Sequence, residues 1–145
     1  MIFYALDPVQ GKGKELARTK LESPTDFDWR VSPEGLRIAL ASQEQLPEQV
    51  RSIDFRDGTE HDLPLPHGWG IWDLSWTADG AALFAAAWST AGYFIARIEL
   101  NGKTRVLLNR SRNQWLGSPR PSPDGRHLAF TQQTWESNAW LLENF

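Results

Sequence analysis

The chain has 145 residues, a formal net charge of −3 at pH 7, eight tryptophans and no cysteine. The lack of cysteine excludes disulfides, thiolate catalysis and thiolate metal sites, and the acidic balance disfavours a nucleic-acid partner. No apolar run approaches the roughly 20 residues that span a bilayer. The N-terminus lacks a basic start and a cleavage site, so we expect no signal peptide. The compartment stays open: cytoplasmic for the chain as it stands, or extracytoplasmic if the chain belongs to a membrane-anchored parent.

Short strand-like stretches alternate with glycine turns along the whole chain. The pattern begins at residues 2–6 and includes apolar runs at 38–41, 83–87 and 128–131. A first set of turns is predicted where a strand-like stretch meets a glycine: residues 2–6 before Gly13, 50–55 before Gly58, and 93–100 before Gly102. A further strand follows each of these turns, as at residues 104–108.

A second set of turns shares a four-residue pattern. Each has a hydroxyl, then Pro or Ala, then an acid and Gly, and the three glycines fall 45 residues apart. Pro presets the backbone for the second turn position, an acid suits the third, and Gly takes the left-handed conformation that closes a bulged type I turn. The three tetrads are Ser32-Pro33-Glu34-Gly35, Thr77-Ala78-Asp79-Gly80 and Ser122-Pro123-Asp124-Gly125.

Four short strands in about 45 residues make one blade of a β-propeller. The sequence therefore predicts an all-β protein, a fragment of a propeller with about three antiparallel blades in one domain, residues 1–145. With strands a to d in each blade, the order is c–d, abcd, abcd, abc over residues 1–22, 23–66, 67–110 and 111–145. A sandwich or barrel could be drawn, but neither requires a constant repeat. The incomplete outer pieces predict a larger propeller, or one completed by homo-oligomerisation.

The repeat resembles the WD40-like repeat of the TolB type (PD40), in which a Ser-Pro-Asp-Gly turn precedes a Leu-Ala-Phe strand. Residues 122–130 match this pattern throughout, whereas Glu34 replaces Asp in one blade, and Thr77 and Ala78 replace Ser and Pro in another. Residues 112–145 are also similar to the C-terminal end of propellers attached to bacterial winged-helix regulators and Ser/Thr kinases. That similarity implies a bacterial sensory or protein-contact module.

No motif for catalysis, a cofactor or a metal emerges. Gly102-Lys103-Thr104 resembles the end of a phosphate-binding loop, but Arg97 stands where the loop requires glycine. The hydrolase pattern Gly-x-Ser-x-Gly is absent. The three histidines occupy unrelated repeat positions. We therefore predict no enzyme and no cofactor.

Tryptophans gather on one predicted face of the propeller. In a propeller the d–a and b–c loops share a face, and five of the eight tryptophans map toward it. Trp and Arg typically anchor interfaces, so this face is a candidate partner-binding surface. Packing between blades is the alternative role for these large side chains. The candidate residues are Trp69, Trp72, Trp88, Arg112, Trp115 and Trp135.

The sequence thus predicts a non-enzymatic scaffold that binds a protein, a peptide or a small ligand. The alternative is an accessory or sensory domain of a Ser/Thr kinase or peptidase, with the catalytic domain elsewhere. The prediction of protein binding is partly an inference from the type of fold.

Overall fold

The computed structural model describes residues 1–20, 27–42 and 49–137. Within these residues the chain forms twelve strands and no helix. The strands are β1 (Ile2–Asp7), β2 (Gly11–Arg18), β3 (Phe27–Val31), β4 (Arg37–Ser42), β5 (Gln49–Asp54), β6 (Glu60–Pro64), β7 (Gly70–Trp76), β8 (Ala82–Ser89), β9 (Gly92–Glu99), β10 (Thr104–Arg110), β11 (Gln114–Pro121) and β12 (Leu128–Thr134).

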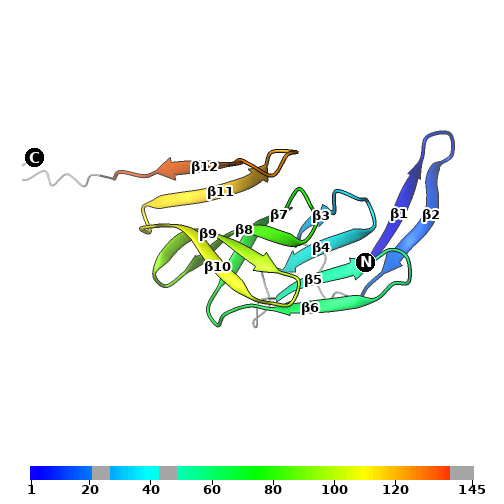
Figure 1. Cartoon of the computed structure of the whole chain (residues 1–145), viewed down its shortest axis with the longest axis horizontal. Helices are drawn as coiled ribbons and strands as arrows, with labels where there is room; N and C mark the ends of the chain where they lie inside the picture. The colour runs from blue at the N-terminus through cyan, green and yellow to red at the C-terminus, as the bar shows by residue number, and fades with distance from the viewer. Residues whose placement is uncertain (21–26, 43–48, 138–145) are drawn as a thin grey trace, which may run out of the picture.

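The strands form four separate antiparallel sheets. Two sheets have four strands each, in the orders β3-β4-β5-β6 and β7-β8-β9-β10, and the pairs β1-β2 and β11-β12 flank them. Figure 1 shows the four sheets following one another, with β1-β2 at one end and β11-β12 at the other. The predicted all-β propeller fragment is thereby confirmed, and the described strands follow the order c–d, abcd, abcd, ab. The further strand c expected to end at Phe145 lies outside the described residues.

The tetrad turn that begins at Thr77 is closed by its own side chains. Gly80 has φ +66°, and its amide donates to the Thr77 carbonyl at 2.9 Å. The Thr77 hydroxyl accepts the Ala82 amide at 3.0 Å and donates to Asp79 Oδ1 at 2.6 Å. Asp79 Oδ1 also accepts the Ala81 amide at 3.0 Å. The hydroxyl and the acid therefore satisfy the backbone groups that a tight reversal leaves unpaired.

The same network recurs in the next blade, where the Ser122 hydroxyl donates to Asp124 and accepts the His127 amide. These donors, with the backbone amides, hold the pKa of Asp79 and of Asp124 below its ordinary value. A carboxylate with a lowered folded-state pKa stabilises the fold above its unfolded pKa. That contribution is lost as the pH falls through the lowered value, so the turns weaken only in strong acid.

The turn between β1 and β2 lies two residues earlier than predicted. Gly11, not Gly13, has the positive φ, at +81°. Asp7 Oδ1 accepts the amides of Val9 and Gln10, both at 2.8 Å, and so orders the turn just before Gly11. Gly13 lies within β2, where an added Cβ would stand 2.9 Å from the Ala5 carbonyl oxygen. The prediction of a turn at Gly13 is wrong, and a close backbone approach accounts for that glycine.

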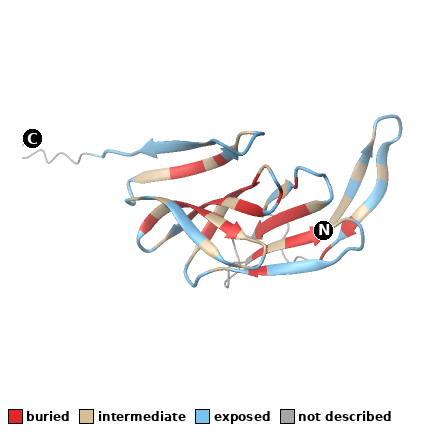
Figure 2. Cartoon of the chain, in the orientation of Figure 1, coloured by how far each residue is buried: buried red, intermediate tan, exposed pale blue. Residues whose placement is uncertain are grey.

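The two complete blades bury both faces of their middle strands (Figure 2). Along β4, Ile38 and Leu40 pack toward Ala17 of β2, while Ala39 and Ala41 pack toward the sheet of β7 to β10. Successive residues of a strand point to opposite faces. Each face of a central sheet therefore joins a different neighbour, and the core is a series of clusters between the sheets.

A charged bridge joins the first strands of three blades. Asp73 on β7, only 13% exposed, accepts hydrogen bonds from Arg30 Nη2 on β3 at 2.9 Å and from Arg120 Nη1 on β11 at 3.1 Å. Asp28 on β3 accepts the Leu74 amide across the same boundary at 2.6 Å. Burial raises the pKa of Asp28, although Arg30 and that amide act in the opposite direction. Ionic contacts thus tie each of these strands to the next.

The bridge at Asp73 should stabilise the stack of blades. Asp73→Asn removes the charge from two ion pairs at a buried position, so the free energy of unfolding should fall by about 1–2 kcal/mol. Urea unfolding followed by tryptophan fluorescence measures the change. Glu15→Gln is the control, because it breaks the exposed pair with Arg18 inside a single hairpin and should leave stability unchanged. Equal losses in the two variants would contradict a special role for the bridge.

Candidate binding site

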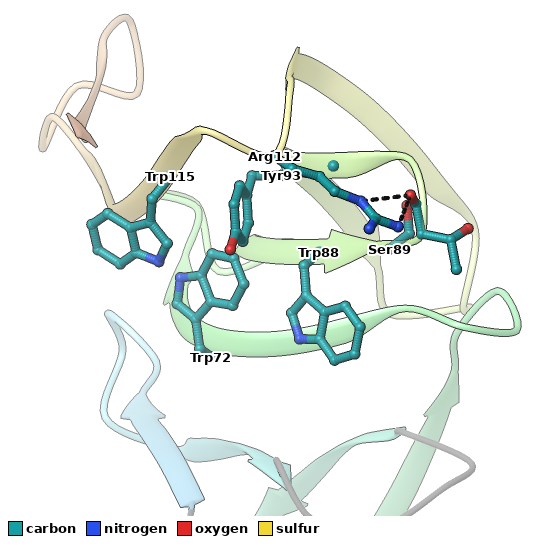
Figure 3. Close-up of a pocket in the computed structure, with 8 residues that line it drawn as sticks. Trp72, Trp88, Ser89, Tyr93, Arg112 and Trp115 are labelled. Atoms are coloured by element: carbon teal, nitrogen blue, oxygen red, sulfur yellow. Dashed lines mark hydrogen bonds between the residues drawn. The ribbon is translucent and has the colours of Figure 1, made fainter. Parts of the chain in front are cut away.

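A groove of about 470 Å³ opens where the blade β7–β10 meets β11. We call it the tryptophan groove. Figure 3 shows its aromatic side chains around the opening, with Arg112 at one side. Its walls come from the beginnings of β7, β9 and β11, the end of β8 and the two loops beside them. Its lining residues are Trp72, Trp88, Ser89, Thr90, Gly92, Tyr93, Arg112 and Trp115.

Two indoles stack across the boundary between blades. The rings of Trp72 on β7 and Trp115 on β11 have centroids 5.8 Å apart and planes 18° apart. Tyr93 on β9 meets Trp72 edge to face, with centroids 5.3 Å apart. Trp72 and Tyr93 also pack against the cluster of Ala86, Ile95 and Leu116. Trp72 and Trp115 therefore do pack between blades, as the alternative interpretation expected, and the same rings line the groove.

Two glycines make room for the indoles. Gly70 pairs with Trp88 across β7 and β8, and a Cβ at Gly70 would lie 1.9 Å from Trp88 Nε1. A Cβ at Gly117 would lie 2.0 Å from Cη2 of Trp115. Each indole lies over backbone that carries no side chain, an arrangement in which an aromatic ring covers a glycine. Sequence reasoning missed both glycines, although a glycine inside a strand signals such a close approach.

Arg112 holds a fixed position at the rim of the groove. Its Nε and Nη2 donate to the Thr90 carbonyl at 3.1 and 2.6 Å, and the side chain is exposed. No carboxylate is among the described residues that line the groove. The neighbouring arginines point elsewhere, Arg110 to Gln132 and Arg120 to Asp73. The groove therefore carries one positive charge from one anchored guanidinium.

The other two predicted candidates lie outside the lining. Trp69 packs edge to face on Phe94, with centroids 4.5 Å apart, against the core between the two complete blades. Trp135, 52% exposed, follows β12, and its amide donates to the Asn113 carbonyl at 2.9 Å. Of the six candidates, the structure brings Trp72, Trp88, Arg112 and Trp115 together, and it adds Tyr93, Ser89 and Thr90. That this face binds a partner stays a prediction.

Residues 1–20, 27–42 and 49–137 hold no group of three His, Asp or Glu side chains that could bind a metal ion. They also contain no helix long and apolar enough to cross a membrane.

Gly70 offers a test of the position of Trp88. In Gly70→Ala the new methyl group collides with the indole, so the free energy of unfolding should fall by about 1–3 kcal/mol. In a Trp88→Ala background the same substitution should cost nothing, because the colliding ring is gone. Urea unfolding of the four proteins of this double-mutant cycle measures the coupling. A cycle with no coupling would mean that Trp88 does not lie over Gly70.

The fold is similar to solved structures of TolB proteins. It matches a protein assigned as a TolB from Agrobacterium tumefaciens with a TM-score of 0.64 and 19% identity, over 77% of this chain and 40% of that chain. The TolB of Acinetobacter baumannii matches with a TM-score of 0.48 and 18% identity, over 83% of this chain and 32% of that one. No protein-family model and no curated protein matches the sequence. The chain thus spans less than half the length of these TolB proteins, and the predicted TolB-type β-propeller fold is confirmed.

Proposed function

We propose that the chain is a non-enzymatic part of a β-propeller scaffold that binds a protein or peptide segment in the tryptophan groove. One observation carries the proposal: Trp72, Trp88, Tyr93 and Trp115 converge on one opening beside an anchored arginine. Trp, Tyr and Arg are the residues that most often carry binding energy at interfaces. An accessory role beside the catalytic domain of a kinase or peptidase stays a prediction from sequence resemblance.

The rigidity of the groove supports this proposal. Trp88 is 45% exposed yet lies against Gly70, and Trp115 is fixed by its stack on Trp72. Side chains that are already ordered lose little conformational entropy when a partner binds. The volume of about 470 Å³ also falls within the usual range of ligand sites. Such a surface suits recognition of a short segment.

We further propose that the chain belongs to a larger ring, with blade pieces 1–22, 23–66, 67–110 and 111–145. In the described residues, β1 pairs only with β2, and β12 only with β11. The first pair supplies strands c and d of one blade, and the second supplies strands a and b of another, which the predicted strand c follows. An open strand edge is a template for pairing with another chain. A second copy of this chain offers edges of the required kind.

The binding proposal is tested with a random library of displayed peptides selected against the immobilised chain. Enriched peptides should bind Trp88→Ala about tenfold more weakly, because the exposed indole is a central anchor of the groove. Trp88 suits the test better than Trp115, whose loss would also remove packing between blades. Trp29→Ala is the matched control, since Trp29 is 51% exposed on β3 and lies outside the groove. Peptides that bind both variants equally, or a library that enriches nothing, would overturn the proposal.

The larger-ring proposal predicts self-association of the isolated chain. Light scattering during size-exclusion chromatography should report a mass that is a multiple of 16.5 kDa. The amides of β1 should be protected from deuterium exchange at high protein concentration and become exposed on dilution. A compact monomer at all concentrations would contradict completion by a second copy.

A further inference from the structure

The chemistry of the tryptophan groove narrows the class of partner segment. Four aromatic rings line it together with two hydroxyl side chains and one arginine, and no described carboxylate does so. We propose that the groove binds a proline-rich segment in the polyproline II conformation that carries an acidic side chain. This inference rests on the proposed function and names the chemistry of the partner.

The aromatic walls suit proline rings. A polyproline II helix presents stiff apolar ridges and has no internal hydrogen bonds. Aromatic-lined grooves recognise such segments because the rings fit between aromatic side chains. In the tryptophan groove the indoles of Trp72 and Trp115 are 18° from parallel, whereas Tyr93 stands at 65° to Trp72. Because Trp72, Tyr93 and Trp115 contact one another, they form an angled apolar surface on which a proline ring can stack beside the exposed indole of Trp88.

The polar groups of the groove suit a backbone with free carbonyls. The carbonyl groups of polyproline II lack partners, so a binding site has to offer donors. The Ser89 hydroxyl accepts the Ala91 amide at 3.2 Å and retains its own hydrogen for donation. The hydroxyl of Tyr93 and the guanidinium of Arg112 are further donors in the lining. The groove thus provides donors beside its rings, as a proline-rich chain requires.

The charge of the groove selects an acidic partner. Two nitrogens of Arg112 are occupied by the Thr90 carbonyl, and Nη1 has no partner among the described residues. A carbonyl partner leaves the full positive charge of the guanidinium uncompensated. Aromatic cages also take quaternary ammonium groups, but the adjacent arginine repels a cation. An Asp or Glu beside the prolines would complete the ion pair.

An oligosaccharide is the competing occupant, because sugars also stack on indoles. Hydroxyl-rich ligands are usually held by the planar amide or carboxylate groups of Asn, Gln, Asp or Glu, each of which can bond two sugar hydroxyls at once. None of these is among the described residues of the lining. The observations therefore favour the peptide, and the sugar becomes one outcome of the test.

The experiment titrates the purified chain with three short peptides that have blocked ends. The first is a run of prolines with one aspartate at its centre, and the second has lysine in place of that aspartate. The third keeps the aspartate but has alanines in place of the prolines. Tryptophan fluorescence gives the affinity, and the indole N–H signals in NMR spectra identify the rings involved. The proline–aspartate peptide should bind about tenfold more tightly than the alanine peptide, since a preformed polyproline II segment loses less entropy on binding. Trp88→Ala should weaken binding of the proline–aspartate peptide about tenfold, and Trp29→Ala should leave its affinity unchanged.

The charge is tested with a second pair of variants. Arg112→Glu should weaken binding of the proline–aspartate peptide about threefold, so that the lysine peptide becomes the tighter binder of the two. Arg126→Glu is the control, because Arg126 is exposed in the turn between β11 and β12 and should alter neither affinity. A preference for lysine in the unaltered protein would overturn the acidic part of the inference.

The outcomes separate the inference from the proposed function. If the alanine peptide binds as tightly as the proline peptide, the polyproline inference fails while the peptide-binding function stands. If cellohexaose shifts the indole signals and no proline peptide does, the groove is a sugar site and the inference is overturned. If neither the three probes nor the peptide library binds, both proposals fail together.

Discussion

The rest of the structure depends on the double-sided burial of the central strands. In β4 and in β8, alternate residues serve two different clusters, one on each face of the sheet. A shift of one residue in register would exchange the two clusters and place small alanines where Ile38 or Leu40 now pack. Register is therefore strongly specified in these blades. The turns and loops, including those that carry the tryptophan groove, take their positions from this stack.

Much of this architecture could be predicted because its signals are local. The tetrad turn is specified by the left-handed glycine and by a hydroxyl and an acid that bond within five residues, as around Thr77. The turn at Gly11 could not be distinguished from one at Gly13, because both glycines suit a turn. The side chain of Asp7 decides between them, and its two bonds to backbone amides belong to the folded turn.

The candidate site was only partly predictable. The repeat frame assigns Trp72, Trp88, Trp115 and Arg112 to one face of the propeller, and the structure gathers these four in one groove. The frame does not specify whether a side chain turns into the core, as Trp69 does to reach Phe94. The frame also does not predict that Tyr93 lines the groove, because the ring of Tyr93 is placed there by its contact with the indole of Trp72 on another strand. Such positions depend on rotamers and on packing between sheets rather than on sequence spacing.

The tryptophan groove and the blade boundary share residues, so a ligand in the groove would also contact side chains that pack the blades together. Trp72 belongs both to the cluster around Leu116 and to the lining of the groove. A ligand held by Trp72 and Trp115 contacts two blades at once, and a ligand that binds only the folded state stabilises it. At the first strands of the same two blades, the pair of Asp73 and Arg120 already limits their separation. The blades are thus held together by contacts of their own, and the groove is formed without a ligand.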